Sequence, residues 1–181
     1  VINATGTKTR IGGSRIRPAA VDAMEEASQS FVRLSDLQAS ASDRIAEATG
    51  AEAGYVTAGA ASALTLGAAA CIAGADLGKM ARLPNVAEPA EIVMPRTHRT
   101  GYDHALRAAG AEVVDVGTND RHLGTGSRNT EPWEIADAIT DRTVAVAYMA
   151  KAYTEPPLST VTATAHDHDV PVIVDAAAEL P

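Results

Sequence analysis

Two segments that lie far apart in the chain carry residues that could bind an anionic, planar ligand. In the first, Gly59, Ala60, Ala61 and Ser62 follow a short apolar stretch and begin an alanine-rich segment. Small residues at the start of a helix present backbone N–H groups and the positive end of the helix dipole, which together favour a phosphate. The alternative is a small-residue turn that allows close packing. The segment is therefore a candidate phosphate site.

In the second segment, Asp175 ends a short apolar stretch, residues 172–175. A carboxylate at the end of a buried strand could keep a pyridine nitrogen protonated, so that the ring accepts electrons during a reaction. The alternative is a helix N-cap, because an alanine-rich segment with Glu179 follows. A phosphate site and such a carboxylate are the two end contacts that pyridoxal 5'-phosphate (PLP) requires. Their combination predicts PLP as the cofactor.

Hydrophobic periodicity predicts alternating strands and helices that would bring these residues together. The expected helices cover residues 18–30, 37–49, 60–73, 102–109, 132–139 and 159–167, and the expected strands cover residues 55–58, 91–94, 112–116, 143–149 and 172–175. Short apolar strands separated by helices are typical of a three-layer α/β fold with a doubly wound, mainly parallel sheet. Ligands bind such sheets at the carboxyl ends of the strands, where Ser62 and Asp175 are expected.

A polar stretch, residues 95–102, follows the expected strand 91–94 and contains His98. His98 could stack on a planar cofactor or act as an acid or base. The alternative is a solvated histidine in a polar loop. A second group, residues 166–169, alternates His and Asp, but it precedes a strand at the edge of the sheet opposite the expected site. We therefore expect a solvated helix end there and no metal.

Composition and charge limit the classes of partner. The chain has 181 residues, 46% of them hydrophobic and 3% aromatic, so it can form one sizeable core from aliphatic side chains. Its net charge of −8 disfavours a nucleic-acid partner. No stretch resembles a membrane span, so no membrane partner is expected. The single cysteine, Cys71, cannot form an internal disulfide, which favours a reducing compartment and hence the cytoplasm.

Several stretches taken together resemble a known family. Residues 1–6, 12–14, 37–53, 55–62, 81–84, 98–104 and 174–181 resemble the selenocysteine synthase-like family of fold-type I PLP enzymes, and within it the D-glucosaminate-6-phosphate ammonia-lyase-like proteins. The resemblance covers essentially the whole chain. It implies the large domain of a PLP-dependent transferase-like fold and a homo-oligomer. Residues 1–50 would form an N-terminal helical segment with an active-site loop, and residues 51–181 the first part of the PLP-binding domain.

The resemblance also implies roles for individual residues. The segment from Gly59 to Ser62 would cradle the cofactor phosphate, His98 would lie against the cofactor ring, and Asp175 would bind its nitrogen. His98 and Asp175 would thus take part in catalysis. The residues implied to face the substrate are Thr7, Lys8, Gly13, Ser14 and Arg82.

The activity implied is that of a lyase. It would catalyse α,β-elimination with release of ammonia from a small-molecule substrate, a hydroxy or sugar amino acid. Other PLP chemistry, such as that of an aminotransferase or aldolase, is an alternative, as is transfer of selenium to seryl-tRNA. A binding or scaffold protein without activity is a further alternative.

One family feature has no counterpart in the chain. The family's Schiff-base lysine follows the pyridine-binding aspartate by a few tens of residues, whereas the lysines here are Lys8, Lys79 and Lys151. We therefore expect the chain to be the N-terminal portion of a longer enzyme, incomplete at its C-terminus and inactive alone.

Overall fold

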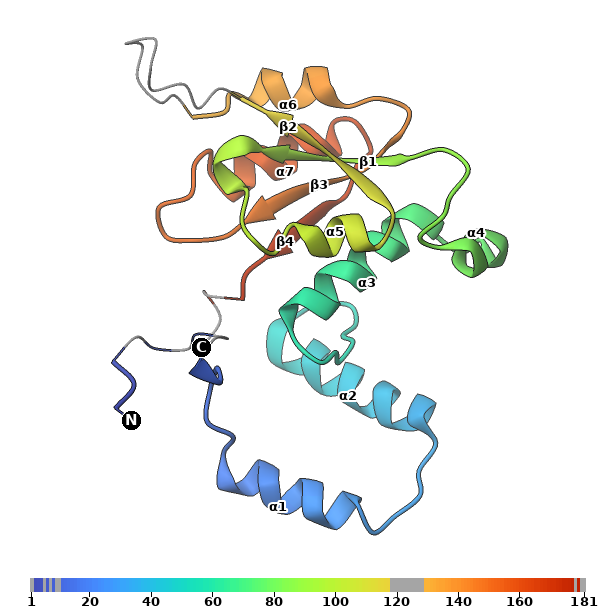
Figure 1. The fold of residues 1–181 in the computed structure, drawn as a ribbon, viewed down its shortest axis with the longest axis vertical. Helices are drawn as coiled ribbons and strands as arrows, with labels where there is room; N and C mark the ends of the chain where they lie inside the picture. Colours follow the sequence, from blue (N-terminus) through green and yellow to red (C-terminus); the bar gives the residue numbers. More distant parts are fainter. Residues whose placement is uncertain are drawn as a thin grey trace. The chain divides into compact units, whose positions relative to one another are not determined.

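The computed structural model describes residues 2–4, 6, 8, 11–117, 129–177 and 179. The chain divides into two compact units, Val1–Val56 and Thr57–Pro181. Figure 1 shows the helices of the first unit and the sheet of the second. None of the helices in these described ranges is long and apolar enough to cross a membrane.

The first unit contains two helices, α1 (Pro18–Ala27) and α2 (Leu34–Thr49). Proline at the first position of α1 has the backbone angle that a helix start needs. Gly50 ends α2 in the left-handed conformation, with φ of 75°. The structure confirms both predicted helices, and neither helix buries a residue within the single chain.

The predicted strand at residues 55–58 is wrong. The side-chain amide of Gln38, on α2, takes the place of a neighbouring strand: its Nε2 donates to the Val56 carbonyl at 3.1 Å, and its Oε1 accepts from the Val56 N–H at 3.2 Å. The backbone polar groups of Val56 are thereby satisfied without a sheet. This short apolar stretch is therefore a connector.

The second unit is built on a parallel sheet of β1 (Ala90–Pro95), β2 (Ala111–Val116), β3 (Thr143–Met149) and β4 (Val172–Asp175) (Figure 1). The strand order is β2-β1-β3-β4, and every neighbouring pair is parallel. The chain extends the sheet outward from β1 to β2 on one side and from β3 to β4 on the other. This is the doubly wound topology that the sequence predicts.

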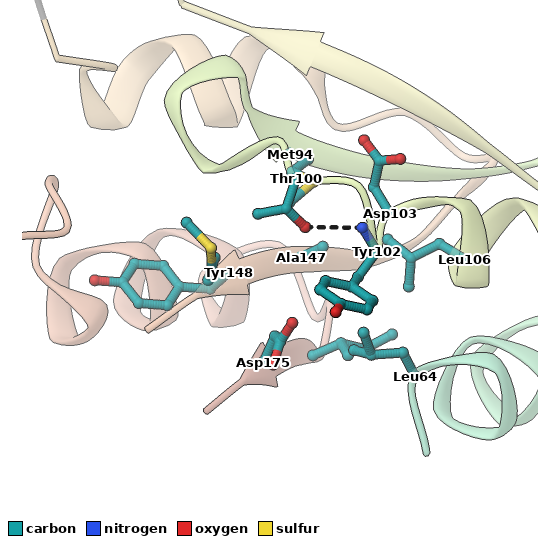
Figure 2. Close-up of a pocket in the computed structure, with 11 residues that line it drawn as sticks. Leu64, Met94, Thr100, Tyr102, Asp103, Leu106, Ala147, Tyr148 and Asp175 are labelled. Carbon is teal, nitrogen blue, oxygen red and sulfur yellow. Dashed lines mark hydrogen bonds between the residues drawn. The ribbon is translucent and has the colours of Figure 1, made fainter. Parts of the chain in front are cut away.

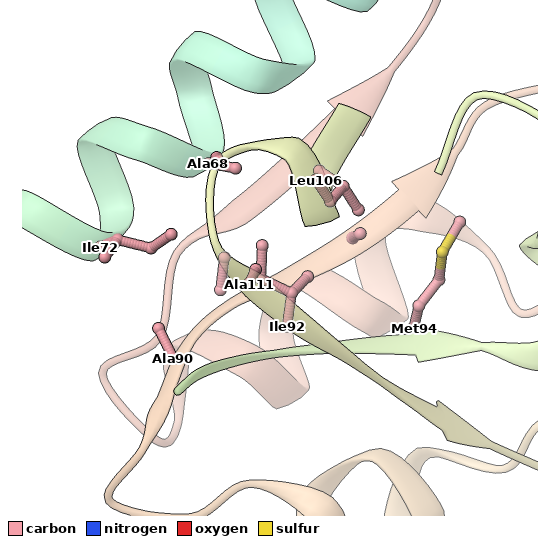
Figure 3. Close-up of a cluster of buried hydrophobic side chains, with 10 residues drawn as sticks. Ala68, Ile72, Ala90, Ile92, Met94, Leu106 and Ala111 are labelled. Atoms are coloured by element: carbon pink, nitrogen blue, oxygen red, sulfur yellow. The ribbon is translucent and has the colours of Figure 1, made fainter. Parts of the chain in front are cut away.

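Helices cover both faces of this sheet. The helices α3 (Ala60–Ala73) and α5 (His104–Ala108) pack on one face, and α6 (Pro132–Ala138) and α7 (Leu158–His166) on the other. Because strand side chains alternate, Ile92 and Met94 of β1 join the first core and Val93 joins the second. Figure 3 shows α3 above the first core. The three-layer α/β prediction is therefore confirmed.

Two short elements complete the second unit. The helix α4 (Leu77–Arg82) is capped by Asp76, whose side chain accepts from the Lys79 N–H at 3.0 Å. A 3-10 turn, η2 (Arg96–His98), leads from the carboxyl end of β1 toward α5. It begins the connection that carries most polar residues of the candidate site.

Candidate active site

Asp175 is the last residue of β4, beside Met149 at the end of β3. The Ala150 N–H donates to the Asp175 carbonyl at 2.9 Å, which fixes the backbone. The Ala177 N–H donates to Asp175 Oδ1 at 3.2 Å, a local turn contact. A helix N-cap makes the same contact, so the N-cap stays the alternative to the cofactor role.

Asp175 lines a small cavity at the carboxyl edge of the sheet (Figure 2). The cavity holds about 20 Å³, enough for one water. Its walls come from α3, β1, β3, β4, α5 and the β1–α5 connection, and they include Leu64, Thr100, Tyr102, Asp103 and Tyr148. Segments from several parts of the sequence thus meet at one strand edge, where ligands bind in parallel sheets.

Gly59 precedes α3 with φ of 133°, a conformation that side chains rarely adopt. A Cβ at this position would meet no atom within 4 Å, so the glycine is required by the backbone and not by crowding. The first amides of α3, up to Ser62, have no acceptor within the helix and are available to an anion. The Thr65 hydroxyl, 3.1 Å from both the Ala61 and Ala105 carbonyls, ties this first turn to α5.

The structure buries His98, leaving 1% of it exposed. Its Nε2 donates to the Glu155 carbonyl at 3.0 Å, and its ring lies nearly perpendicular to that of Tyr148, with the ring centroids 4.7 Å apart. Among the described residues, Nδ1 has no hydrogen-bond partner. Burial lowers the pKa of His98, so the ring is neutral near pH 7. His98 does not line the cavity of Asp175, and its contact with a cofactor ring stays a prediction.

A group of ion pairs beside the cavity was not found by sequence reasoning. We call it the Arg99 network. Arg99 pairs with both Asp103 and Asp115, Arg107 donates to Asp103 at 3.0 Å, and Arg96 lies 3.3 Å from Asp115. Burial raises the pKa of Asp103, but the hydrogen bonds and charges of Arg99 and Arg107 outweigh it and lower the pKa. Arg99, Asp103 and Arg107 follow one another at intervals of four residues, and this spacing was the signal in the sequence that could have indicated the ion pairs.

Of the predicted substrate residues, Arg82 is the one in the second unit, and it does not line this cavity. Arg82 ends α4 and lines a separate hollow of about 320 Å³ with Arg142, at the amino ends of the strands. Lys8, Gly13 and Ser14 belong to the first unit, where the Lys8 carbonyl accepts from the Gly13 N–H at 3.0 Å. Thr7 lies outside the described residues. The substrate roles of all five residues stay predictions.

No family model matches the chain. A curated relative from a Streptomyces species, 5'-C-glycyluridine monooxygenase-decarboxylase, is 34% identical over 99% of this chain and 46% of its own length. D-glucosaminate-6-phosphate ammonia lyase from Salmonella typhimurium is 30% identical over 99% of this chain and 49% of its own length. The chain thus spans about half the length of both curated relatives.

Solved structures show the same relationship. A structure of D-glucosaminate-6-phosphate ammonia-lyase matches 98% of this chain and 48% of its own with a TM-score of 0.88 and 29% identity. A Thermus thermophilus aspartate aminotransferase variant matches 95% of this chain and 42% of its own with a TM-score of 0.56 and 19% identity, a likeness of fold alone. The chain is homologous to D-glucosaminate-6-phosphate ammonia-lyase and has the α/β fold of the PLP-dependent transferases.

Proposed function

We propose that the protein containing this chain is a PLP-dependent lyase. The observation that carries the proposal is the position of Asp175, which ends β4 and shares a cavity with Leu64, close to the start of α3. The Asp175 carboxylate, an acceptor, and the amides at the start of α3, which are donors, suit the two ends of PLP, the protonated ring nitrogen and the phosphate. The homologous ammonia-lyase shares the fold over almost the whole chain.

Each group of residues has a role in binding. The amides of Ala60 and Ala61, with the Ser62 hydroxyl, would hold the phosphate, because they are donors at the positive end of α3. The Asp175 carboxylate would accept from the protonated ring nitrogen, while its Oδ1 keeps the bond from the Ala177 N–H. Bound PLP supplies an electron sink for a carbanion next to the substrate's amino group.

The reaction we propose is α,β-elimination on a hydroxy or sugar amino acid. The substrate loses its α-proton and β-hydroxyl, and hydrolysis then gives a keto acid and ammonia. The substrate class follows the name of the homologous lyase, which acts on D-glucosaminate 6-phosphate. Thr7, Lys8, Gly13, Ser14 and Arg82 remain our candidates for substrate contacts.

A second candidate is oxidative decarboxylation, the activity in the name of the Streptomyces relative. This relative is 34% identical to the chain, compared with 30% for the lyase. A dependence on molecular oxygen distinguishes the two reactions, because the elimination consumes no oxygen and the oxidative decarboxylation does. Ammonia release in the absence of oxygen would support the lyase, whereas turnover that stops without oxygen would support the second candidate. Aminotransfer or aldol cleavage would release neither ammonia nor carbon dioxide.

We also propose the selenocysteine synthase-like family and a homo-oligomer in the cytoplasm. The first unit supports an oligomer, because neither α1 nor α2 contains a buried residue, and Met24, Leu34 and Leu37 on these helices and Phe31 between them are exposed. Transfer to seryl-tRNA is disfavoured by the net charge of −8. Light scattering during size exclusion should give a mass of at least twice the protomer, and a monomer would contradict the oligomer.

The first test is an absorbance spectrum of the purified full-length protein before and after borohydride. We expect a long-wavelength cofactor band that borohydride bleaches, with the reduced label on a lysine other than Lys8, Lys79 and Lys151. The absence of the band after incubation with PLP would overturn the cofactor and the lyase together. A label on Lys151 would keep the cofactor but contradict the expected position of the Schiff-base lysine.

A further inference from the structure

The amino edge of the sheet has a hollow that the proposed function does not use. It holds about 320 Å³, which is room for a small ligand. Its apolar wall includes Ile72 near the end of α3, Ala90 at the start of β1 and Val144 on β3, and Figure 3 shows the first two at the same end of the first core. Because β1 has six residues, roughly 17 Å separate its start from the carboxyl edge, where Asp175 lies. Within one chain the hollow is therefore distinct from the cavity of Asp175.

Positive charges gather around this hollow. Lys79, Arg82 and Arg142 all line it. Lys79 and Arg82 belong to the last turn of α4 and are three residues apart, so they lie on the same side of the helix. The backbone N–H of Lys79 and the charges of both side chains lower the pKa of Asp76, an acid that does not line the hollow. In a chain with a net charge of −8, such a group of cations is a candidate site for an anion.

Arg142 is held in place by its neighbours. Its carbonyl accepts from the Glu91 N–H at 2.9 Å, and its own N–H donates to the Thr140 hydroxyl at 3.1 Å. Its guanidinium pairs with the Glu91 carboxylate, which is 5% exposed and does not line the hollow. A guanidinium has five N–H donors, so the half-exposed Arg142 side chain keeps donors for a ligand. A side chain held in this way loses less freedom on binding, which strengthens binding.

Two carboxylates limit the class of anion. Glu88 comes shortly before β1, Asp141 comes shortly before β3, and both line the hollow. They would repel a simple anion, because they carry the same charge. A carboxylate accepts hydrogen bonds, so it suits a hydroxyl group that belongs to the same ligand as the anionic group. Arginine pairs with phosphate in a bidentate geometry. The lining residues therefore suit a phosphate ester whose carbon skeleton carries hydroxyl groups.

We propose that the hollow at the amino edge binds a small phosphorylated compound with free hydroxyl groups. Lys79, Arg82 and Arg142 contact the phosphate, and Glu88 and Asp141 accept from the hydroxyl groups. This site requires no PLP and does not depend on the proposed lyase activity. It gives Arg82 a ligand at the edge opposite the candidate active site, as the alternative to the substrate contact that the family resemblance implies.

The test is calorimetric titration of the full-length protein, freed of unbound PLP, with glycerol 3-phosphate and with inorganic phosphate. Glycerol 3-phosphate should bind with the lower dissociation constant, because its hydroxyl groups reach the carboxylates. Arg82→Gln and Lys79→Gln should each raise both dissociation constants roughly tenfold, the size expected for loss of a charged hydrogen bond. Arg44→Gln is the matched control: the Arg44 side chain is 81% exposed, lies in the first unit and pairs with Glu47, so it should change neither constant.

Three further variants test the other contacts. Arg142→Lys keeps a positive charge beside Glu91 but loses the planar fork, and it should raise both dissociation constants roughly threefold. Glu88→Ala and Asp141→Ala remove an acceptor together with its repulsion, so each should reduce the preference for glycerol 3-phosphate over inorganic phosphate. All of these side chains are exposed or half exposed, and thermal denaturation should show each variant folded.

The outcomes separate this inference from the proposed function. A wild-type protein that binds neither compound at millimolar concentration would overturn the phosphate site and leave the lyase proposal intact. Binding that is unchanged in Arg82→Gln and Lys79→Gln, or that falls equally in Arg44→Gln, would overturn the site as well. An unchanged preference in Glu88→Ala and Asp141→Ala would overturn the hydroxyl contacts. Binding by a protein without a cofactor band would support this site and overturn the lyase alone.

Discussion

The two edges of the sheet both contain buried acids paired with arginine, but they differ in what those pairs support. At the amino edge, Glu91 pairs with Arg142 and accepts from the Thr140 hydroxyl at 2.6 Å. Glu91 and its two partners lie where β1 and β3 begin, at the irregularity in the pairing of these strands next to Glu91. The charges there satisfy one another and fix the start of the strands.

At the carboxyl edge, the Arg99 network instead adjoins the cavity that holds Tyr102 and Asp175. The amino edge has the larger hollow, about 320 Å³ against about 20 Å³. Neither hollow size nor buried charge therefore identifies the candidate site. The position at the carboxyl ends of the strands, where α3 also contributes to the cavity wall, distinguishes the candidate site.

The largest expected effect is at Asp175. Asp175→Asn keeps the acceptor for the Ala177 N–H but removes the charge opposite the ring nitrogen. Turnover should fall roughly a hundredfold or more, the size seen when a preorganised group at a reacting centre is lost. The free energy of unfolding, measured in urea without cofactor, should change by less than about 0.5 kcal/mol. A parallel loss of turnover and folded protein would contradict the role.

Glu91→Gln should give the opposite pattern. Glu91 is 5% exposed, whereas Arg142 is half exposed, so part of the pair's energy is screened by water. Chemical denaturation should show a loss of about 1–2 kcal/mol in the free energy of unfolding. Turnover per folded molecule should stay at the wild-type value. A loss of turnover comparable to that of Asp175→Asn would remove the distinction between the edges.

Two glycines, Gly59 just before α3 and Gly67 within it, test whether the start of α3 has a special backbone conformation. Gly59→Ala forces a side chain into a φ of 133° and should lower the free energy of unfolding by about 1–3 kcal/mol while weakening PLP binding. Gly67→Ala lies inside α3, where a Cβ meets no atom within 4 Å, and should raise the free energy of unfolding by about 0.5–1 kcal/mol. Equal effects in thermal denaturation would show that the α3 start has no special geometry.

The smallest expected effect concerns pH. Burial lowers the pKa of His98 in the folded state, so the unfolded state binds a proton first as the pH falls below its ordinary value of about 6.5. The free energy of unfolding should therefore be fully retained above that pH and should decrease below it. His98→Gln, which can still donate to the Glu155 carbonyl, should flatten the profile between pH 7.5 and 5.5. An unchanged slope would assign the effect to other groups.

Sequence reasoning succeeded where local pattern and tertiary environment agree. The predicted bounds of α3, β3 and β4 match the structure because each is an apolar run ended by a turn or a polar residue. The positions of Asp175 at the end of β4 and of residues 59–62 at the start of α3 follow for the same reason, and their roles stay predictions. The parallel sheet followed from their alternation.

The features that were not predicted from the sequence depend mainly on contacts between residues that are far apart in the sequence. The stretch at 55–58 has strand-forming residues, but Gln38 provides the hydrogen bonds that a strand would need. His98 and Tyr102 are four residues apart in one polar loop, and His98 is buried where it contacts Tyr148 and the Glu155 carbonyl, both distant in sequence. The helix α4 is a single short segment held by its Asp76 cap, too short for a periodic signal.

The order of the strands also bears on how the protein is made. β4 follows β1, β2 and β3 along the chain and pairs with β3. During translation the ribosome would release those three strands before Asp175 emerges, so they would pair before the carboxylate that we propose as a cofactor contact is present. A cofactor that binds Asp175 would stabilise only chains in which β4 has docked. Vitamin B6 supply would then influence the yield of folded protein as well as its activity.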